Sequence, residues 1–238
     1  MINGVYMSDK NHVEKHSYDD FGFLIKSLVI NAPTVQTHKV EIPGRNGLLD
    51  LTESLTGKVQ YNNREITIEF RYLGAENTRS SVLSQFENFA HGQLMKFTFD
   101  DDYAYYYEGR IESIEPVVNG KAYDITVTID ADPMKYYLQS TAEDWLWDPF
   151  DFEEGVINEP ATNLVVSGTL VYTLLVTGGS GEPTIISTAA MTVLYKGKTY
   201  SIIKGTQVMY GLVISEGENI LQFNGNGKVT IEFRGGRL

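Results

Sequence analysis

A two-residue alternation of apolar and polar side chains is the feature that most limits what this chain can fold into. In residues 64–72 (REITIEFRY), every second residue from Ile66 to Tyr72 is apolar or aromatic, and the residues between them are polar. Residues 123–131 (YDITVTIDA) repeat the pattern. Because successive side chains of a β-strand point to opposite faces, both segments are expected to be half-buried strands. Further strands are expected at 35–42, 94–99 and 104–114, so the chain is predicted to be mainly β.

One segment of the first half has a helical period instead. Apolar residues in 78–93 (TRSSVLSQFENFAHGQ) recur every three or four positions, with Phe86 at the centre. This spacing is typical of an amphipathic helix packed against a sheet. Ser80 or Ser81 is expected to cap the first turn, and Gly92 to end the helix in the left-handed conformation.

The second half is predicted to contain strands joined by short turns. Lys196-Gly197-Lys198 and Gly225-Asn226-Gly227 each lie between two strand-like runs, and glycine and asparagine tolerate the positive φ that tight hairpins need. The glycine-rich run 178–181 (GGSG) lacks the Gly-Lys-Ser/Thr ending of a phosphate-binding loop and is expected to be a sheet turn.

The expected architecture has two β-rich domains. Three prolines interrupt the acidic and aromatic stretch 132–160, which indicates a domain junction near Leu138. We therefore predict an N-terminal β-barrel or sandwich-like domain with one packed α-helix at residues 1–138, and a C-terminal antiparallel β-sandwich at residues 139–238.

Composition excludes several kinds of chemistry. The chain has no cysteine, so it has no disulfides, thiolate metal sites or cysteine nucleophiles. Nineteen Lys and Arg against 31 Asp and Glu give a net charge of -12, which argues against adhesion to nucleic acid or to an anionic membrane. No run approaches the roughly 18 apolar residues of a membrane span, and the N-terminus lacks the pattern of a secretory signal.

Several polar clusters raise the question of catalysis or metal binding. His12 and His16, close to Asp9 and Glu14, could hold a metal ion together only if their segment were a helix. A flexible or interface arm near the terminus is the preferred interpretation of this segment. The run 100–102 (DDD) lacks calcium-loop spacing and is expected to be a solvated hairpin turn. A glycosidase pair needs two acids across a cleft, which proximity in sequence does not supply. The acids considered for such a pair were Asp148, Asp151, Glu153 and Glu154.

The first half resembles a known protein family. The segments that carry the resemblance occur in a fixed order: DFGFLIKSLVINAP, HKVEIPGRNGLLDLTESLTGKVQYNNREITIEF, AHGQLMKFTFDDDYAYYYEGR and ITVTIDADPMKYY. The most specific pieces are IPGRNGLLDLTE at 42–53 and DADPMKYY at 130–137. Together they resemble the distal tail proteins of siphophages that infect Gram-positive bacteria. The second half, with WLWDPFDFEEGVI and NGNGKVTIEFRGGRL, is similar to the C-terminal domain of that family.

The resemblance implies a structural protein and not an enzyme, with no cofactor. It implies a homo-hexameric ring at the distal end of the virion tail, made after synthesis in the bacterial cytoplasm. The expected partners are the major tail tube protein, a tail-associated lysin or baseplate hub protein, and a receptor-binding protein. DNA would pass through the ring without sequence-specific binding, and no membrane partner is implied. The C-terminal domain would be a galectin-like jelly roll that projects outward.

One loop is the candidate interface between subunits or with the tail. It combines a proline of fixed φ, two permissive glycines and charged side chains that neighbouring subunits can pair, although a simple strand connection explains the same pattern. The candidate interface residues are Glu41, Pro43, Gly44, Arg45, Asn46, Gly47 and Asp50.

The alternative function is binding of host-surface carbohydrate by the baseplate. Trp145 and Trp147 are the candidate glycan-stacking aromatics, although two residues on the same side of a strand also suit packing at the domain junction. All four histidines lie at or before His91, so the body of the second domain lacks the His and Trp of a galectin-type sugar site. A fold alone does not confer a function. A tail-bound glycan hydrolase is the third and weakest hypothesis.

Overall fold

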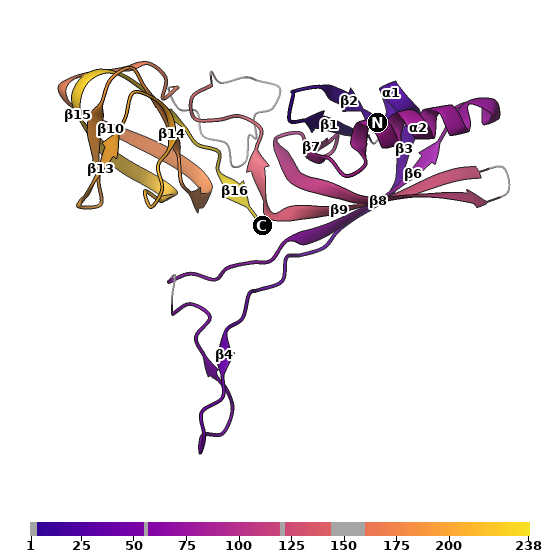
Figure 1. Cartoon of the computed structure of the whole chain (residues 1–238), viewed down its shortest axis with the longest axis horizontal. Coiled ribbons are helices and arrows are strands. Elements are labelled where there is room, and N and C mark those ends of the chain that lie inside the picture. Colours follow the sequence, from indigo (N-terminus) through magenta and orange to yellow (C-terminus); the bar gives the residue numbers. More distant parts are fainter. Residues whose placement is uncertain (1–3, 55–56, 120–121, 144–159) are drawn as a thin grey trace. The chain divides into compact units, whose positions relative to one another are not determined.

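The computed structural model describes residues 4–54, 57–119, 122–143 and 160–238. The chain forms two compact units (Figure 1). The first unit comprises Met1–Asp102, Tyr106–Lys135 and Leu238, and the second comprises Tyr103–Tyr105 and Tyr136–Arg237. Both units are built mainly of antiparallel strands, which confirms the predicted β class.

The first unit is built on one large sheet, which contains the predicted strands at 64–72, 94–99, 104–114 and 123–131. Its strands are, in spatial order, β2 (Glu14–His16), β1 (Val5–Asp9), β7 (Leu94–Phe99), β8 (Tyr105–Asn119), β9 (Ala122–Tyr137), β6 (Arg64–Tyr72) and β3 (Phe23–Ile30), and β16 (Gly236–Arg237) pairs with β9. Alternation works as expected, because Ile66, Ile68 and Phe70 are buried while the residues between them are partly exposed.

The predicted helix is α2 (Arg79–Ala90), and it covers one face of this sheet. Phe86 is fully buried, with its ring 5.2 Å from the rings of Phe21 and Phe23. The predicted serine cap is wrong: a 3-10 turn, η1 (Glu76–Thr78), precedes the helix, so Ser80 and Ser81 lie inside the first helical turn. Gly92 has φ 70°, as predicted for the residue that ends the helix.

The N-terminal segment differs from expectation. It is a β-hairpin of β1 and β2 joined to β7, followed by the short helix α1 (Ser17–Phe21). The prediction of a flexible arm is therefore wrong for residues 5–16, whereas an interface role of this segment stays a prediction. The disfavoured alternative, a helical metal site, lacks its helix, because His12 sits in the exposed hairpin turn with φ 61° while His16 is buried at the end of β2.

The second unit is a six-stranded antiparallel arrangement. Its strands run in the order β13 (Lys198–Ile202), β12 (Met191–Tyr195), β15 (Ile214–Glu232), β11 (Thr184–Ser187) and β14 (Gly205–Val208), and β10 (Leu164–Gly181) also pairs with β15. Inward-facing residues such as Leu221, Phe223 and Ile231 form its core. Lys196 and Gly197 have positive φ between β12 and β13, which confirms the first predicted hairpin.

Two of the predicted turns lie inside long strands. Residues 225–227 pair with β10 in the middle of β15, where a side chain on Gly225 would collide with Met191. These glycines serve close packing, and the predicted hairpin is wrong. Residues 178–181 belong to the end of β10, where the register shifts between Val176 and Ser180. The glycine run is therefore a β-bulge instead of a turn.

Candidate docking arm

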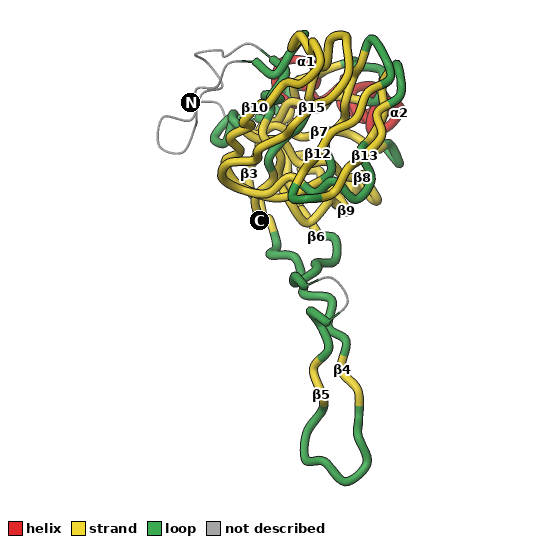
Figure 2. Tube along the Cα trace, turned by 90° about the vertical axis from the view of Figure 1, so that its left-hand side faces the viewer, coloured by secondary structure: helices red, strands yellow, loops and turns green. Residues whose placement is uncertain are grey.

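Residues 31–54 and 57–63, between β3 and β6, form a long arm that runs away from the sheet (Figures 1 and 2). Midway along the arm, Val35 bridges to Tyr61. Near its end the two short strands β4 (Lys39–Val40) and β5 (Leu49–Asp50) pair antiparallel. The strand predicted at 35–42 is thus reduced to residues 39–40, because among the described residues this segment pairs only with the returning half of the arm.

The tip of the arm begins with a tight turn. The N–H of Arg45 donates to the carbonyl of Ile42 at 3.1 Å, with Pro43 and Gly44 in between. Gly44 has φ 82°, so the four residues match a type II turn, which favours proline at its second position and glycine at its third. Gly47 has φ 78° and lies in a bend of the chain at residues 46–47. The tip is therefore a shaped loop, because its glycines occupy a conformation that other residues rarely adopt.

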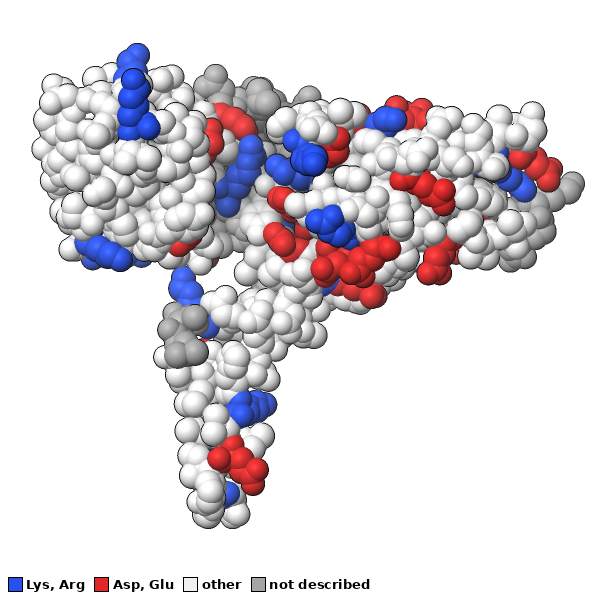
Figure 3. Space-filling model, in the orientation of Figure 1, with Lys and Arg blue, Asp and Glu red and all other residues white. Residues whose placement is uncertain are grey.

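Apolar and charged residues alternate along the paired strands of the tip. Val40 lies opposite Leu49, and Lys39 lies opposite Asp50, so the two pairs face opposite sides of the hairpin. Val40 is 47% exposed and Leu48 is 55% exposed. Figure 3 shows the arm as a mostly uncharged surface with acidic and basic side chains gathered near its tip. The tip therefore presents apolar side chains that its own chain leaves uncovered.

All seven predicted interface residues lie on this tip, and all are exposed. The side chains of Glu41 and Arg45 form no ion pair within the described part of the chain. Asp50 accepts hydrogen bonds from the backbone N–H of Thr52 at 2.9 Å and from its hydroxyl at 2.5 Å. These bonds lower the pKa of the Asp50 carboxyl below its usual value. Subunit pairing by these residues remains a prediction.

The sheet face opposite α2 carries an ion network. Asp124 is nearly buried and accepts from Arg71 at 2.8 and 3.0 Å and from Lys26 at 3.1 Å. Lys26 also contacts Glu69 at 2.5 Å. Hydrogen bonds from Arg71, and then from Lys26, lower the pKa of Asp124 to about 2. The charged residues of this outer face include Glu65, Glu69, Glu108, Glu112, Asp124 and Asp130 against Lys26, Arg71, Lys96 and Arg110.

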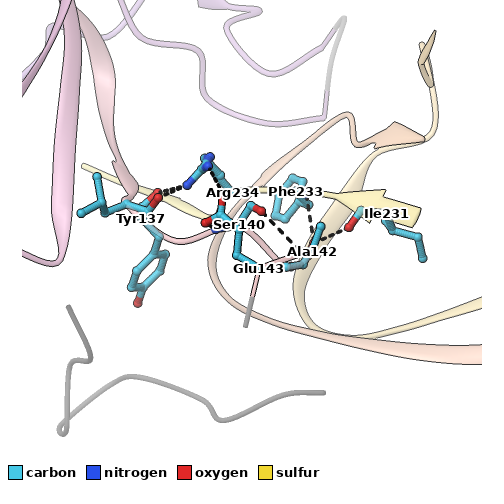
Figure 4. A network of polar contacts seen from close by, with 9 residues as sticks. Tyr137, Ser140, Ala142, Glu143, Ile231, Phe233 and Arg234 are labelled. Atoms are coloured by element: carbon cyan, nitrogen blue, oxygen red, sulfur yellow. Dashed lines mark hydrogen bonds and ion pairs between the residues drawn. The ribbon is translucent and has the colours of Figure 1, made fainter. Parts of the chain in front are cut away.

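A second polar network ties residues 137–143 to the end of β15 (Figure 4). Arg234 donates to the carbonyl of Leu138 and forms an ion pair with Glu143 at 2.9 Å. Thr141 exchanges backbone and hydroxyl hydrogen bonds with Ile231 and Phe233, at 2.8 to 3.0 Å. This described part of the predicted junction segment is thus held to the second unit by hydrogen bonds, and it consists of bends and turns. Trp145, Trp147 and the acids considered for a glycosidase lie outside the described residues.

The other polar clusters have structural partners. Asp100 accepts from the backbone N–H of Gly4 at 2.7 Å and lies 3.4 Å from the His16 imidazole, and Asp102 contacts Lys135 at 2.5 Å. The run 100–102 is the β7–β8 turn, as predicted, but Asp100 is only partly solvated. In residues 4–54, 57–119, 122–143 and 160–238, no His, Asp and Glu cluster fits a metal ion. No helix in those ranges is long and apolar enough to span a membrane.

The apolar residues of the arm were missed from the sequence. Val40 and Ile42 alternate with Lys39 and Glu41, which was a signal for a two-sided hairpin, but the predicted interface included only the charged and turn-forming positions.

We compared the chain with known protein families, curated proteins and solved structures. No protein-family model and no curated protein matches the chain. Among solved structures, the chain is similar to the SPP1 Dit protein, described as a paradigm of the hub adsorption apparatus in phages that infect Gram-positive bacteria. The TM-score is 0.61 at 14% sequence identity, and the similarity covers 98% of this chain and 99% of that one. The chain therefore has a fold like that of the SPP1 Dit protein.

Proposed function

We propose that this chain is a structural protein of a phage tail tip, where six copies form a ring through their first units. The ring joins the tail tube to a tail-associated lysin or baseplate hub protein and leaves a passage for DNA. The observation that carries the proposal is the arm, whose tip has apolar side chains uncovered by its own chain, in a protein with the fold of a hub component.

The arm needs a partner on physical grounds. An isolated two-stranded hairpin is at best marginally stable in water, and β4 and β5 pair over only two residues each. Packing Val40, Ile42 and Leu48 against another protein removes their surface from water, which stabilises both the contact and the arm. A neighbouring copy is the proposed partner within the ring, with Glu41 and Arg45 setting the register.

The sheet supplies a second contact. Within the part of the chain that the structure describes, β3 pairs with β6 on one side only, so one edge of this eight-residue strand leaves backbone groups available for pairing. An edge and an arm are different surfaces, as a head-to-tail interface requires, and such interfaces close into rings. We propose that both take part.

The outer face of the sheet suits a DNA passage. Acidic residues outnumber basic ones among the charged residues named on this face, and the basic residues Lys26 and Arg71 are already paired. A wall of this kind repels phosphates weakly and offers them few free cations, so DNA moves without adhering. Outward second units would then hold receptor-binding proteins.

The test is assembly of the full chain. Purified protein at tens of micromolar, alone and mixed with tail tube protein, is measured by light scattering and negative-stain electron microscopy. We expect sixfold rings, and we expect Leu48→Asp to weaken association by at least about tenfold, because a charge cannot be buried in an apolar contact. Val171→Asp is the matched control, since Val171 is 59% exposed on β10 of the second unit. Wild-type protein that stays monomeric even with tube protein would overturn the proposal.

A further inference from the structure

Arg64 is a buried cation at the root of the arm. It is the first residue of β6, where the arm rejoins the sheet, and it is 5% exposed. One hydrogen bond holds it, from Nη2 to the carbonyl of Pro133. Its guanidinium also lies over the ring of Tyr107, 5.5 Å from the centroid.

This guanidinium has far fewer partners than it can use. It carries five N–H groups, and its Nε is buried without a hydrogen-bond acceptor. No carboxylate of the described residues forms an ion pair with it. Burial lowers its pKa, which shows that the charged form is poorly compensated. Arg71, on the same strand, instead donates two hydrogen bonds to Asp124.

A buried charge without a counter-charge opposes folding, so its presence calls for a partner outside the monomer. We propose that Arg64 binds a carboxylate of a second copy of this chain when the ring closes. The planar fork of a guanidinium matches a carboxylate with two parallel hydrogen bonds. Arginines at the centre of interfaces are also frequent anchors of binding.

A second copy is the favoured source of that carboxylate. The chain has 31 acidic residues against 19 basic ones, so the surface of a neighbour is rich in suitable groups. A head-to-tail ring contact brings a different surface of the neighbour to the site, so the acid need not be near Arg64 in its own chain. The inference rests on the ring proposed above.

The test depends on two measurements that move in opposite directions. Arg64→Met removes the unpaired charge at similar length, so the unfolding midpoint of the dilute monomer should rise by about 3 to 8 °C. The same change should weaken ring association by at least about 30-fold, since an interface anchor is lost. A purely structural arginine would lower the unfolding midpoint instead. Arg71→Met is the matched control and should lower it, because Asp124 loses its main partner.

Two further variants and one ligand complete the test. Arg64→Lys keeps the charge but loses the fork, so association should fall while the monomer gains no stability. If the wild type and Arg64→Met both form rings of equal stability, this inference alone is overturned. If the wild type forms no rings, the proposed function is overturned as well. Inorganic phosphate could also raise the unfolding midpoint of the wild type and leave that of Arg64→Met unchanged. This result would indicate that Arg64 binds a free anion, and it would contradict binding to a carboxylate of a second copy.

Discussion

Arg71 and Asp124 face each other across β6 and β9 and form a two-pronged ion pair, with Nε–Oδ1 at 2.8 Å and Nη2–Oδ2 at 3.0 Å. Asp124 is 8% exposed, while Arg71 is 41% exposed. The carboxylate of Asp124 is therefore buried, and its negative charge is compensated by Arg71 and Lys26.

This pair predicts a pH dependence of stability. The pKa of Asp124 falls from its usual 3.8 to about 2 in the folded state, so the unfolded state binds the proton first. The contribution, about 2 kcal/mol, is complete above about pH 4 and is lost as the pH falls to about 2. Urea unfolding of the wild type and Asp124→Asn should show a gap in free energy of unfolding at pH 7 that closes by pH 2. A gap that is independent of pH would contradict the assignment.

Separate cores predict separate unfolding of the two proposed domains. Phe86 lies at 0% exposure in the core of the first unit, and Phe223 does so in the second. Phe86→Ala should cost about 3 to 5 kcal/mol and lower one calorimetric transition, and Phe223→Ala should lower the other. A single transition moved equally by both changes would argue against division of the chain near residue 138.

The bulge in β10 predicts a position that accepts glycine alone. Gly179 has φ 74°, and a Cβ there would lie 2.2 Å from the carbonyl oxygen of Gly236. Gly179→Ala should destabilise the second unit by more than about 2 kcal/mol, because backbone must move. Gly168→Ala is the control: Gly168 has φ 76° with open space around it, so only the conformational strain of about 1 kcal/mol is expected. Thermal unfolding of both variants measures the difference, and equal losses would contradict the steric argument.

Glycan binding is a prediction for the competing function. We expect the full chain to bind no host polysaccharide on a glycan array, since the body of its second domain, after Trp145 and Trp147, lacks the His and Trp of a galectin-type site. Binding that disappears in Trp145→Ala or Trp147→Ala, but persists in Phe150→Leu, would support the carbohydrate-binding alternative instead. Turnover of cell-wall polysaccharide would support the hydrolase.

Strands with strict alternation were predictable, and strands with irregular neighbours were not. Residues 64–72 and 123–131 bury every second side chain in one core, so the sequence pattern records their environment directly. The N-terminal hairpin carries polar residues at its turn, and only its long-range pairing with β7 fixes it in the sheet. Glycine runs were misassigned because positive φ serves bulges and close packing as well as turns.

The site was predicted at its tip but not as a whole. The sequence of 41–50 shows a shaped, charged loop, and the structure places it at the end of the arm. The length of the arm could not be inferred, since it follows from β3 and β6 being neighbours. Arg64 was missed because nothing in the strand pattern distinguishes a buried arginine without a counter-charge from one with a carboxylate opposite it.

The pairing of Ile30 with Ile66 closes the β3–β6 ladder just where the intervening segment departs. The register of the sheet is thus determined by residues outside that segment, and the entropy of closing a connection grows only with the logarithm of its length. Insertions or deletions between these two isoleucines should be tolerated by the folding of the protein. Evolution can therefore adjust the reach of the molecule toward a new assembly while leaving its scaffold unchanged.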